Sequence, residues 1–343
     1  MRRLKIPGTI SKEEAIEKMN TWGSAGNPFQ FLISFDGSEN FIVTPGESRR
    51  IGLYIGMPGW DSGYRPDTSD PDSGEKSKLT NQPIHFEKHP VDPKHYKNAF
   101  DHVIEEIHYG NSFLLNLTFP TKIETNLSLS EIFYRSASPF RLLLEDRLVI
   151  FSPERFIRIE GSRIITNPMK GTIDAAVPGA YHKLVTDPKE DAEHNTIVDL
   201  LRNDLSTIAT KVQVRKFKHV DRIKTNKGEL LQMSSEITGI LPENFRSHLG
   251  EILFSMLPAG SVTGAPKKKT LQIINQVEGY RRGFYTGIFG YFNGNEMDAA
   301  VAIRYMEKQD EELVFKSGGG ITFQSNWRKE YQEMIDKVYV PLA

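Results

Sequence analysis

The stretch Thr166-Asn-Pro-Met-Lys-Gly-Thr-Ile173 follows a β-type run, Arg163-Ile-Ile-Thr166, and holds a lysine in its middle. Because Gly171 comes directly after Lys170, the backbone at this point can approach a ligand closely. The pattern therefore predicts an ammonium group at the end of a strand. Taken alone, such a lysine is most often a solvated surface residue.

Composition excludes several classes of protein. The 343 residues carry a net charge of −1, and 38% of them are apolar, which is normal for a globular chain and gives no charge field for nucleic acid or acidic membranes. Without cysteine the chain has no disulfide, thiolate metal site or cysteine nucleophile. No stretch resembles the apolar core of a signal peptide or a bilayer span. We expect a cytoplasmic protein with no nucleic-acid or membrane partner.

Hydrophobic patterns predict more strands than helices. Strands are expected at 29–35, 40–44, 51–55, 113–119, 148–151, 155–159, 285–292, 298–306 and 313–316, with more within 212–242. Helices are expected at 93–109, 129–136, 188–205, 249–257, after Pro266 and at about 326–339. Turns such as Asn293-Gly294 suit hairpins. We therefore expect an α+β fold of large, mainly antiparallel sheets packed face to face, with helices on the outside.

The organisation along the chain changes near residue 94. Residues 1–94 are predicted to form a short, β-rich N-terminal segment that packs on the same core. Within it, residues 57–83 are rich in Gly, Pro, Asp, Ser and Lys, which indicates a mobile loop. Residues 95–343 are expected to form the catalytic domain.

Two pairs of glutamates share a spacing of three residues. Glu190 and Glu193 lie on the helix that opens at Asp187, and Glu330 and Glu333 lie on the last helix, so each pair shares one helix face. If the two pairs face each other, they offer the hard oxygen ligands that Mg²⁺ prefers. The alternative is that Glu190 completes a capping box and the pairs are solvated.

Glu154 follows Ser152-Pro153 at the end of an apolar strand. A half-buried glutamate at this position would have its pKa raised by desolvation, which suits a general acid. The alternative is a structural ion pair with Arg155 or Arg158.

Two patterns indicate anion binding. Gly318-Gly-Gly320 separates two strand-like runs, and consecutive glycine N–H groups can form a nest for a carboxylate, although a flexible turn is the commoner reason for such a run. Arg304 lies inside the predicted strand Ala300-Val-Ala-Ile-Arg-Tyr305 and needs an anionic partner. That partner can be a ligand or an acidic side chain of the protein.

Four runs taken together resemble the chorismate-utilising enzymes, over about residues 95–343. They are the Lys170 stretch, Phe151-Ser-Pro-Glu154, Gly260-Ser-Val-Thr-Gly-Ala-Pro-Lys267 and Ser317-Gly-Gly-Gly-Ile-Thr322. Lys170, together with Ser261 and Thr263, resembles the aminodeoxychorismate synthase component I branch, because anthranilate synthases tend to carry threonine and serine in the reverse places. The resemblance implies the chorismate-binding fold of anthranilate synthase component I.

The resemblance also implies roles for individual residues. Glu154 is expected to protonate the departing C4 hydroxyl of chorismate. Lys170 is expected to act as a covalent nucleophile, and the alternative is that it only contributes positive charge near a substrate carboxylate. Glu193 and Glu333 would bind Mg²⁺, with Glu190 and Glu330 binding it directly or through water. The residues implied in substrate binding are Gly171, Thr172, Tyr291, Arg304, Gly318, Gly319, Gly320 and Lys337.

The implied activity is the Mg²⁺-dependent conversion of chorismate and ammonia to 4-amino-4-deoxychorismate, for 4-aminobenzoate and folate synthesis. Ammonia would come from a separate glutamine amidotransferase subunit, because this chain has no cysteine to attack glutamine. One alternative is anthranilate synthase component I, and another is a non-catalytic, anion-binding regulatory subunit. Leu114 stands where hydroxylating relatives carry a residue that handles water, which argues against that chemistry. Gln232 stands where histidine is common and leaves one substrate contact in doubt.

Overall fold

The computed structural model describes residues 8–63, 83–225 and 228–342, and in this part of the chain it forms two antiparallel sheets. The first sheet contains β1 (Phe29–Ile33), β2 (Asn40–Val43), β9 (Arg155–Glu160), β10 (Arg163–Thr166), β11 (Met169–Asp174), β12 (Thr210–Thr225), β13 (Gly228–Ile240), β15 (Ile288–Phe292) and β16 (Met297–Val301). Its order is β11-β13-β10-β9-β16-β15-β1-β2, with β12 also paired to β13.

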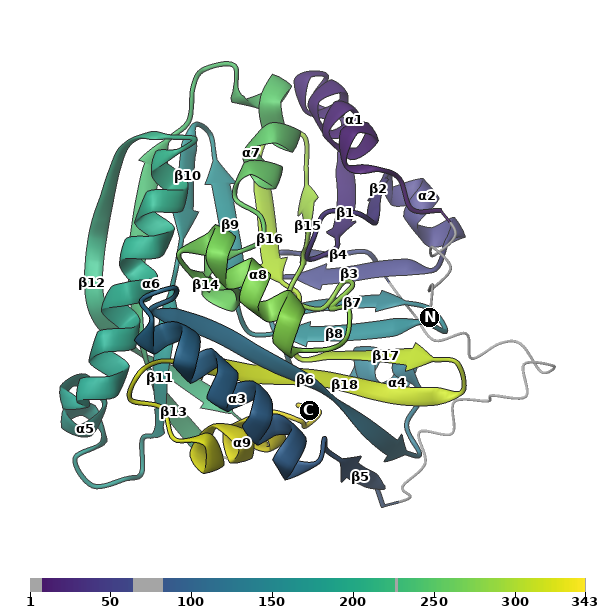
Figure 1. Cartoon of the computed structure of the whole chain (residues 1–343). Helices are drawn as coiled ribbons and strands as arrows, with labels where there is room; N and C mark the ends of the chain where they lie inside the picture. Colours follow the sequence, from purple (N-terminus) through teal and green to yellow (C-terminus); the bar gives the residue numbers. More distant parts are fainter. Residues whose placement is uncertain (1–7, 64–82, 226–227, 343) are drawn as a thin grey trace.

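The second sheet contains β3 (Leu53–Met57), β4 (Trp60–Asp61), β5 (Phe86–His89), β6 (Leu114–Thr125), β7 (Phe140–Leu144), β8 (Leu148–Ser152), β14 (Gly264–Ala265), β17 (Tyr305–Gln309) and β18 (Glu312–Ile321). Its order is β14-β6-β18-β17-β8-β7-β3-β4, and β5 pairs with β6. In Figure 1 the strands of the first sheet run up the view and those of the second run across it.

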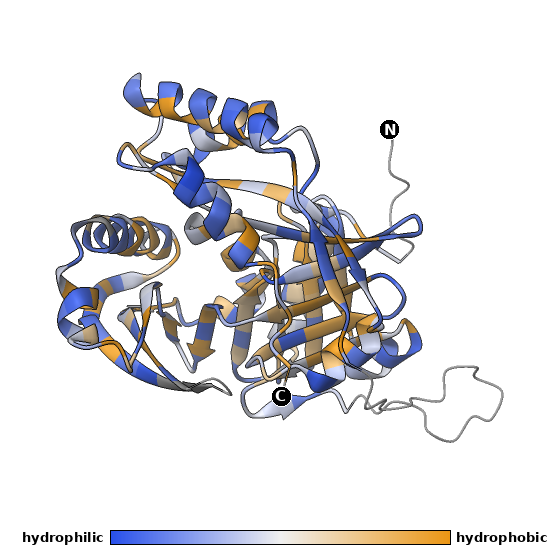
Figure 2. Cartoon of the chain, turned by 90° about the horizontal axis from the view of Figure 1, so that it is seen from below, coloured by the Kyte–Doolittle hydropathy of each residue, from blue (hydrophilic) through white to orange (hydrophobic). Residues whose placement is uncertain are grey.

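The helices are α1 (Lys12–Ser24), α2 (Pro45–Arg50), α3 (Pro93–His108), α4 (Leu129–Arg135), α5 (Ala180–Thr186), α6 (Pro188–Ser206), α7 (Leu249–Ser255), α8 (Lys267–Val277) and α9 (Trp327–Asp336). The helices α3, α8 and α9 pack together over β6 and β18. Figure 2 shows apolar residues concentrated in the strands at the centre of the molecule, while the helices at its edge mix apolar and hydrophilic residues.

The core follows from the alternation of side chains along each strand. Leu32 and Phe289 of the first sheet lie in one apolar cluster with Ile150 of the second sheet. Their chain neighbours, Phe31 and Ile288, belong to another cluster that includes residues of α1, α6 and α7. Successive side chains of a strand point to opposite faces, so the first sheet buries one face against the second sheet and the other against helices. The predicted fold class is confirmed.

Three local predictions need correction. The predicted strand 298–306 is broken, because β16 ends at Val301 and β17 begins at Tyr305, and Arg304 between them has φ +52°. Gly318–Gly320 is neither a turn nor a nest: it lies inside β18 and pairs with β6. Of the predicted loop at 57–83, residue 57 ends β3 and β4 follows, whereas 64–82 lies outside the described residues.

A buried ion pair ties β18 to β17. Lys316 Nζ lies 2.8 Å from Glu307 Oε1, and both side chains are almost completely inaccessible. We expect Lys316→Ala to lower the free energy of unfolding by about 3–5 kcal/mol, because it leaves a buried carboxylate without its cation. Urea denaturation measures this, and Lys308→Ala, which removes an exposed partner of Glu311, should behave like wild type. Equal effects of the two substitutions would contradict the assignment.

Candidate active site

A cavity of about 430 Å³ opens where the chain crosses twice between the two sheets. The first crossing leads from β8 to β9 through Glu154, and the second leads from β16 to β17 through Arg304. The crossings run side by side: Val301 N–H donates to the Glu154 carbonyl and Phe151 N–H donates to the Arg304 carbonyl, both at 3.1 Å. The two crossings therefore place the Glu154 carboxyl group and the Arg304 guanidinium group at the same cavity.

Glu154 is half-buried and accepts a hydrogen bond from Ser261 Oγ at 2.7 Å. Burial raises the pKa of Glu154 above its ordinary value, although the Ser261 hydroxyl and the nearby Lys170 oppose this shift. The alternative ion pairs are not formed, because Arg155 is held by Asp298 at 2.8 Å and Arg158 lies against Glu160. The environment therefore favours a carboxyl group that keeps its proton, as a general acid must.

The pH dependence of turnover should report this proton. The acid form of Glu154 exists below its pKa in the folded protein, so the rate should fall as pH rises through that value. In Ser261→Ala the hydrogen bond that stabilises the carboxylate is lost, and the pKa of Glu154 rises further. We therefore expect the alkaline limb of the profile of kcat against pH to move to higher pH. A limb that stays in place or moves to lower pH would contradict the role of Glu154.

Lys170 lies in β11 beside an irregularity of the pairing with β13. Gly171 has φ +74°, and a Cβ atom there would lie 2.8 Å from Leu184 and 3.3 Å from Glu190 Oε2, so this position requires glycine. Lys170 Nζ lies 3.0 Å from Glu193 Oε2. Burial alone would lower the pKa of Lys170, but the carboxylates, Glu193 foremost, outweigh it and raise the pKa above its ordinary value. In the ligand-free protein these carboxylates therefore favour the ammonium form of Lys170.

Three of the four glutamates approach the glycines of β18, and the fourth, Glu190, approaches Gly171 of β11. A Cβ atom on Gly319 would lie 3.3 Å from Glu333 Oε1 and 3.7 Å from Glu330 Oε2, and one on Gly320 would lie 3.8 Å from Glu193 Oε2. Glu193 and Glu330 are buried, at 7% and 1% exposure. Carboxylates of α6 and α9 thus approach one strand from two helices.

The donor set fits a hard divalent cation. It consists of carboxylate oxygens, two of which pair with lysines: Glu193 with Lys170, and Glu333 with Lys337 at 2.7 Å. Among the described residues, the one group of at least three whose potential ligand atoms all lie within 4.8 Å is the exposed set on β5 and β6, namely His85, Glu87 and Glu124. The four glutamates do not form such a group in this ligand-free structure, so a cation bound between them would have to keep several of its waters.

Cationic groups line the same cavity. Arg304 Nε is buried and has no hydrogen-bond partner within the described ranges, and its guanidinium carbon lies 5.2 Å from the Tyr339 ring centre. Burial lowers the pKa of Lys337, and the neighbouring Glu333 opposes this shift. Lys337 Nζ donates to the Gly318 carbonyl at 2.9 Å. An uncommon backbone conformation and a buried guanidinium nitrogen without a partner are features of a functional, anion-binding residue.

The glycine run contributes a strand edge. Pairing of β17 with β18 ends at Lys316, whereas β6 pairs with β18 as far as Ile321. Gly318 and Gly320 line the cavity, so the backbone edge that β17 leaves uncovered faces it. A Cβ atom on Gly318 would lie 2.2 Å from the Leu117 carbonyl, which explains why glycine is required in a regular strand.

Most of the predicted site residues lie at this one cavity. Its lining includes Glu154, Lys170, Gly171, Thr172, Glu190, Glu193, Arg304, Gly318, Gly320, Glu333 and Lys337. Gly319 and Glu330 do not line it but lie against each other beside it. Gln232 also lines it, with Nε2 3.5 Å from Thr172 Oγ1. Leu114 is not in the lining and instead packs near Gly320.

Tyr291 is a third predicted site residue that does not line the cavity. Its ring stacks on Trp60, with ring centres 3.8 Å apart and planes 11° apart, and it is absent from the cavity lining. The tyrosine that lines the cavity is Tyr285, just before β15. The sequence did not identify Tyr285 or Asn116 as residues of the site. The available signal for Tyr285 was its position at the start of a predicted strand, two residues after Gly283.

The sequence matches a family model. The model of chorismate-binding enzymes matches residues 63–343, more than half of the chain. The chain belongs to the chorismate-binding enzyme family. In the part of this chorismate-binding enzyme that the structure describes, no helix has the length and apolarity to cross a membrane.

Relatives of this chorismate-binding enzyme carry different names. It is 48% identical over 327 residues to an uncharacterized PabA-like protein of Haemophilus influenzae, with 95% of this chain and 96% of that one covered. It is 34% identical to aminodeoxychorismate synthase component 1 of Escherichia coli, covering 71% of this chain and 56% of that one. It is 35% identical to anthranilate synthase component 1 of Archaeoglobus fulgidus, covering 68% and 58%.

Solved structures share the fold. Anthranilate synthase component I from Streptococcus pneumoniae superposes with a TM-score of 0.68 at 22% identity, covering 91% of this chain and 79% of that one. A putative 2,3-dihydroxybenzoate-specific isochorismate synthase from Bacillus anthracis gives 0.69 at 20% identity, covering 95% and 86%.

Proposed function

We propose that this chorismate-binding enzyme is an aminodeoxychorismate synthase component I, which converts chorismate and ammonia to 4-amino-4-deoxychorismate. The observation that carries the proposal is Lys170, a primary amine in the wall of the cavity, beside Glu193 and within the electrostatic reach of Glu154. A relative with this name supports it, although relatives named anthranilate synthase are similar to the same degree.

The cavity can bind a dianion by its cations. Arg304, Lys337 and the uncovered edge of β18 offer donors for the ring and enolpyruvyl carboxylates of chorismate. The Glu190, Glu193, Glu330 and Glu333 carboxylates would hold Mg²⁺, which would neutralise one substrate carboxylate and fix its position. This arrangement leaves Lys170 and Glu154 for the reacting carbons.

The proposed chemistry uses two additions. Lys170 Nζ forms a bond to C2, the two ring double bonds shift from C1=C2 and C5=C6 to C6=C1 and C4=C5, and the C4 hydroxyl leaves as water with the proton of Glu154. Ammonia then forms a bond to C4, both double bonds shift back, and the C2–Nζ bond breaks and restores the lysine. Glu154, left as a carboxylate by the first step, takes a proton from the new amine.

The nucleophile must first lose its proton. In the ligand-free protein the Glu193 carboxylate stabilises the ammonium form of Lys170 and raises its pKa, after burial has acted in the opposite direction. Binding of Glu193 to a divalent cation would weaken that ion pair and add positive charge nearby, and both effects lower the pKa of Lys170. The metal requirement and the reactivity of Lys170 are thus parts of one arrangement.

One incubation tests the function. The pure chain is mixed with chorismate, Mg²⁺ and an ammonium salt, the product is identified by mass, and a lyase that forms 4-aminobenzoate is added. We expect an aminated product that the lyase converts to 4-aminobenzoate. Formation of 2-aminobenzoate would identify an anthranilate synthase, and absence of any amination would leave a non-catalytic binding subunit.

The nitrogen source gives a separate prediction. Glutamine in place of the ammonium salt should support almost no turnover by the isolated chain, because the sequence has no cysteine to attack the amide. Addition of a glutamine amidotransferase subunit should restore it. Rapid glutamine-dependent turnover by the chain alone would contradict this prediction.

A further inference from the structure

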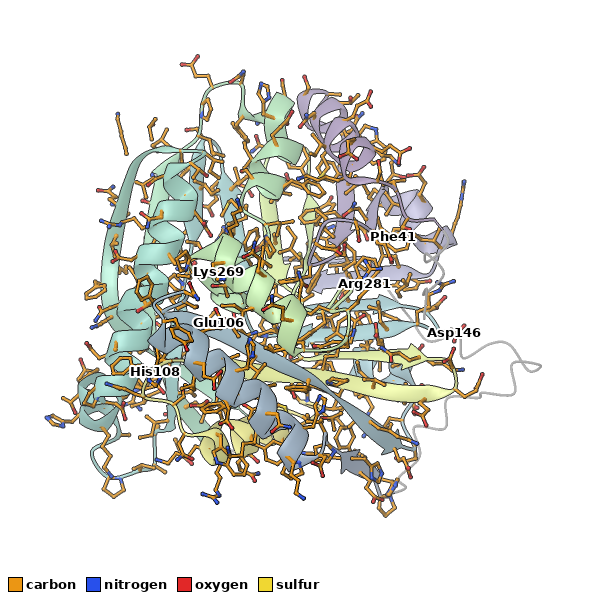
Figure 3. The ribbon with its side chains drawn as sticks, viewed as in Figure 1. Phe41, Glu106, His108, Asp146, Lys269 and Arg281 are labelled. Atoms are coloured by element: carbon orange, nitrogen blue, oxygen red, sulfur yellow. The ribbon has the colours of Figure 1, made fainter. Side chains whose placement is uncertain are left out.

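A second cavity has a volume of about 280 Å³, and its lining residue Arg282 bonds to two residues that line the first cavity. It is lined by Phe35, Asp36, Pro258, Leu271, Ile274, Asn275, Glu278, Tyr280, Arg281, Arg282 and Gly283. Arg281, labelled in Figure 3, is exposed and pairs with Asp36 at 3.1 Å, and Asn275 of α8 is also exposed. This cavity therefore reaches the surface between α8 and the segment after β1.

One side chain separates the two cavities. Arg282 lines the second cavity, and its Nη1 and Nη2 donate to the carbonyls of Val262 (2.8 Å) and Asn116 (2.6 Å), both of which line the first. Glu278 holds the guanidinium by two bonds, at 2.9 and 2.6 Å. Arg282 and Glu278 are both 3% exposed, so this wall is closed in the structure.

Polar groups continue along the wall on one strand. Thr118 Oγ1 lies 2.6 Å from the hydroxyl of Tyr280, a lining residue of the second cavity, and 2.8 Å from Glu278 Oε1. Asn116 is two residues earlier on β6, so its side chain shares the face of Thr118, and it lines the first cavity. A small polar molecule that moved along the wall would pass the hydroxyls of Tyr280 and Thr118 and then the amide of Asn116.

The wall between the two cavities reaches the first cavity close to Glu154. Val262, whose carbonyl binds Arg282, directly follows Ser261, whose hydroxyl donates to Glu154. Glu154 is the group assigned to protonate the C4 hydroxyl, and the C4–N bond forms at that carbon. A molecule that passes Arg282 therefore enters the first cavity beside Glu154.

We propose that the second cavity is the intake through which neutral ammonia reaches bound chorismate, with Arg282 as its gate. The proposal rests on the proposed amination. Lys316 Nζ donates to the Arg282 carbonyl at 2.8 Å. Arg282 is paired with Glu278 and Lys316 with Glu307, so the buried wall carries no net charge. Removing an ammonium ion from water at this wall costs far more than removing uncharged ammonia, and Leu271 and Ile274 give the intake an apolar side.

Filling the intake from the surface tests the proposal. Asn275→Trp places a large side chain in the second cavity, and Gln276→Trp places the same side chain at an exposed neighbouring position that does not line it. With the full chain, chorismate, Mg²⁺ and varied ammonium chloride, we expect Asn275→Trp to lose roughly ten-fold or more in kcat/KM for ammonium. The KM for chorismate should not change, and Gln276→Trp should match wild type.

A second cavity variant and the wild-type chain distinguish failure of the intake proposal from failure of the proposed amination. Leu271→Trp, from a half-buried position on the same helix, should reproduce the loss. Wild-type kcat/KM for ammonium in both cavity variants would overturn the intake and leave the proposed function intact. A wild-type chain that makes no amine from ammonium would overturn both.

Discussion

Lys170→Ala should lose at least about 10³-fold in kcat while it still binds chorismate, because the nucleophile is gone but Arg304, Lys337 and the edge of β18 remain. The reaction rate is measured with ammonium as the nitrogen source, and binding is measured directly by calorimetry. Some of the residual turnover could yield the 2-amino isomer, since ammonia can then add at C2 itself. Wild-type rates in Lys170→Ala would rule out the nucleophile.

Lys170→Arg distinguishes a nucleophile from a mere positive charge. Arginine keeps the cation that pairs with Glu193 but does not deprotonate in proteins, so it cannot attack carbon. If Lys170 is the nucleophile, the arginine variant should be as inactive as the alanine variant. Activity that is restored by arginine would assign Lys170 to charge alone. Lys183→Ala, on the exposed side of α5, serves as the control.

Glu193→Gln and Glu333→Gln should each reduce activity by about 10²-fold or more and raise the Mg²⁺ concentration needed for half-maximal rate. Glutamine keeps the shape of the side chain but removes the charge that a hard cation requires. The two residues come from α6 and α9 and approach adjacent glycines of β18, so losing either one opens one side of the site.

The control for these variants is Glu251→Gln, an exposed position on α7. It should match wild type in rate and in Mg²⁺ dependence. Unchanged thermal unfolding of Glu193→Gln and Glu333→Gln shows that the loss is not a loss of fold. Full activity of both variants in the presence of a chelator would contradict the magnesium site.

The sequence predicts regular elements well where local signals and packing agree. Asp92 and Asp187 open α3 and α6 with side-chain caps, followed in each case by proline at the first helical position. The helices α1 and α2 were missed, although Ser11 and Thr44 begin capping boxes. Their apolar periodicity is weak because α1 buries only three residues and α2 only one.

The geometry of the site was less predictable. The run Ala300–Tyr305 resembles one strand in the sequence because the strands on both sides of the crossing are buried and apolar. No polar turn residue therefore marks the point where the chain crosses between the sheets and places Arg304 at the cavity. The glycine run reads as a turn, since the close approach of the Leu117 carbonyl is a tertiary contact. Tyr285 and Tyr291 are six residues apart, and the sequence does not show that the second stacks on Trp60.

The positions of Glu154 and Lys170 at the cavity were predictable because each stands beside a backbone signal. Glu154 follows a proline where β8 ends. Lys170 precedes Gly171, which adopts a left-handed backbone conformation that favours glycine. The charge state of Lys170 was not predictable, since it depends on Glu193, which is 23 residues away in the chain.

The central claim is that Lys170 forms a bond to chorismate, and peptide mass analysis tests it most directly. The protein is incubated with chorismate and Mg²⁺ under limiting ammonia, quenched in acid and digested. We predict that the peptide containing Lys170 gains the mass of chorismate less one water, and that Glu154→Gln lowers the yield of this adduct. An unmodified Lys170 peptide, in samples that make the aminated product at the normal rate, would contradict the account.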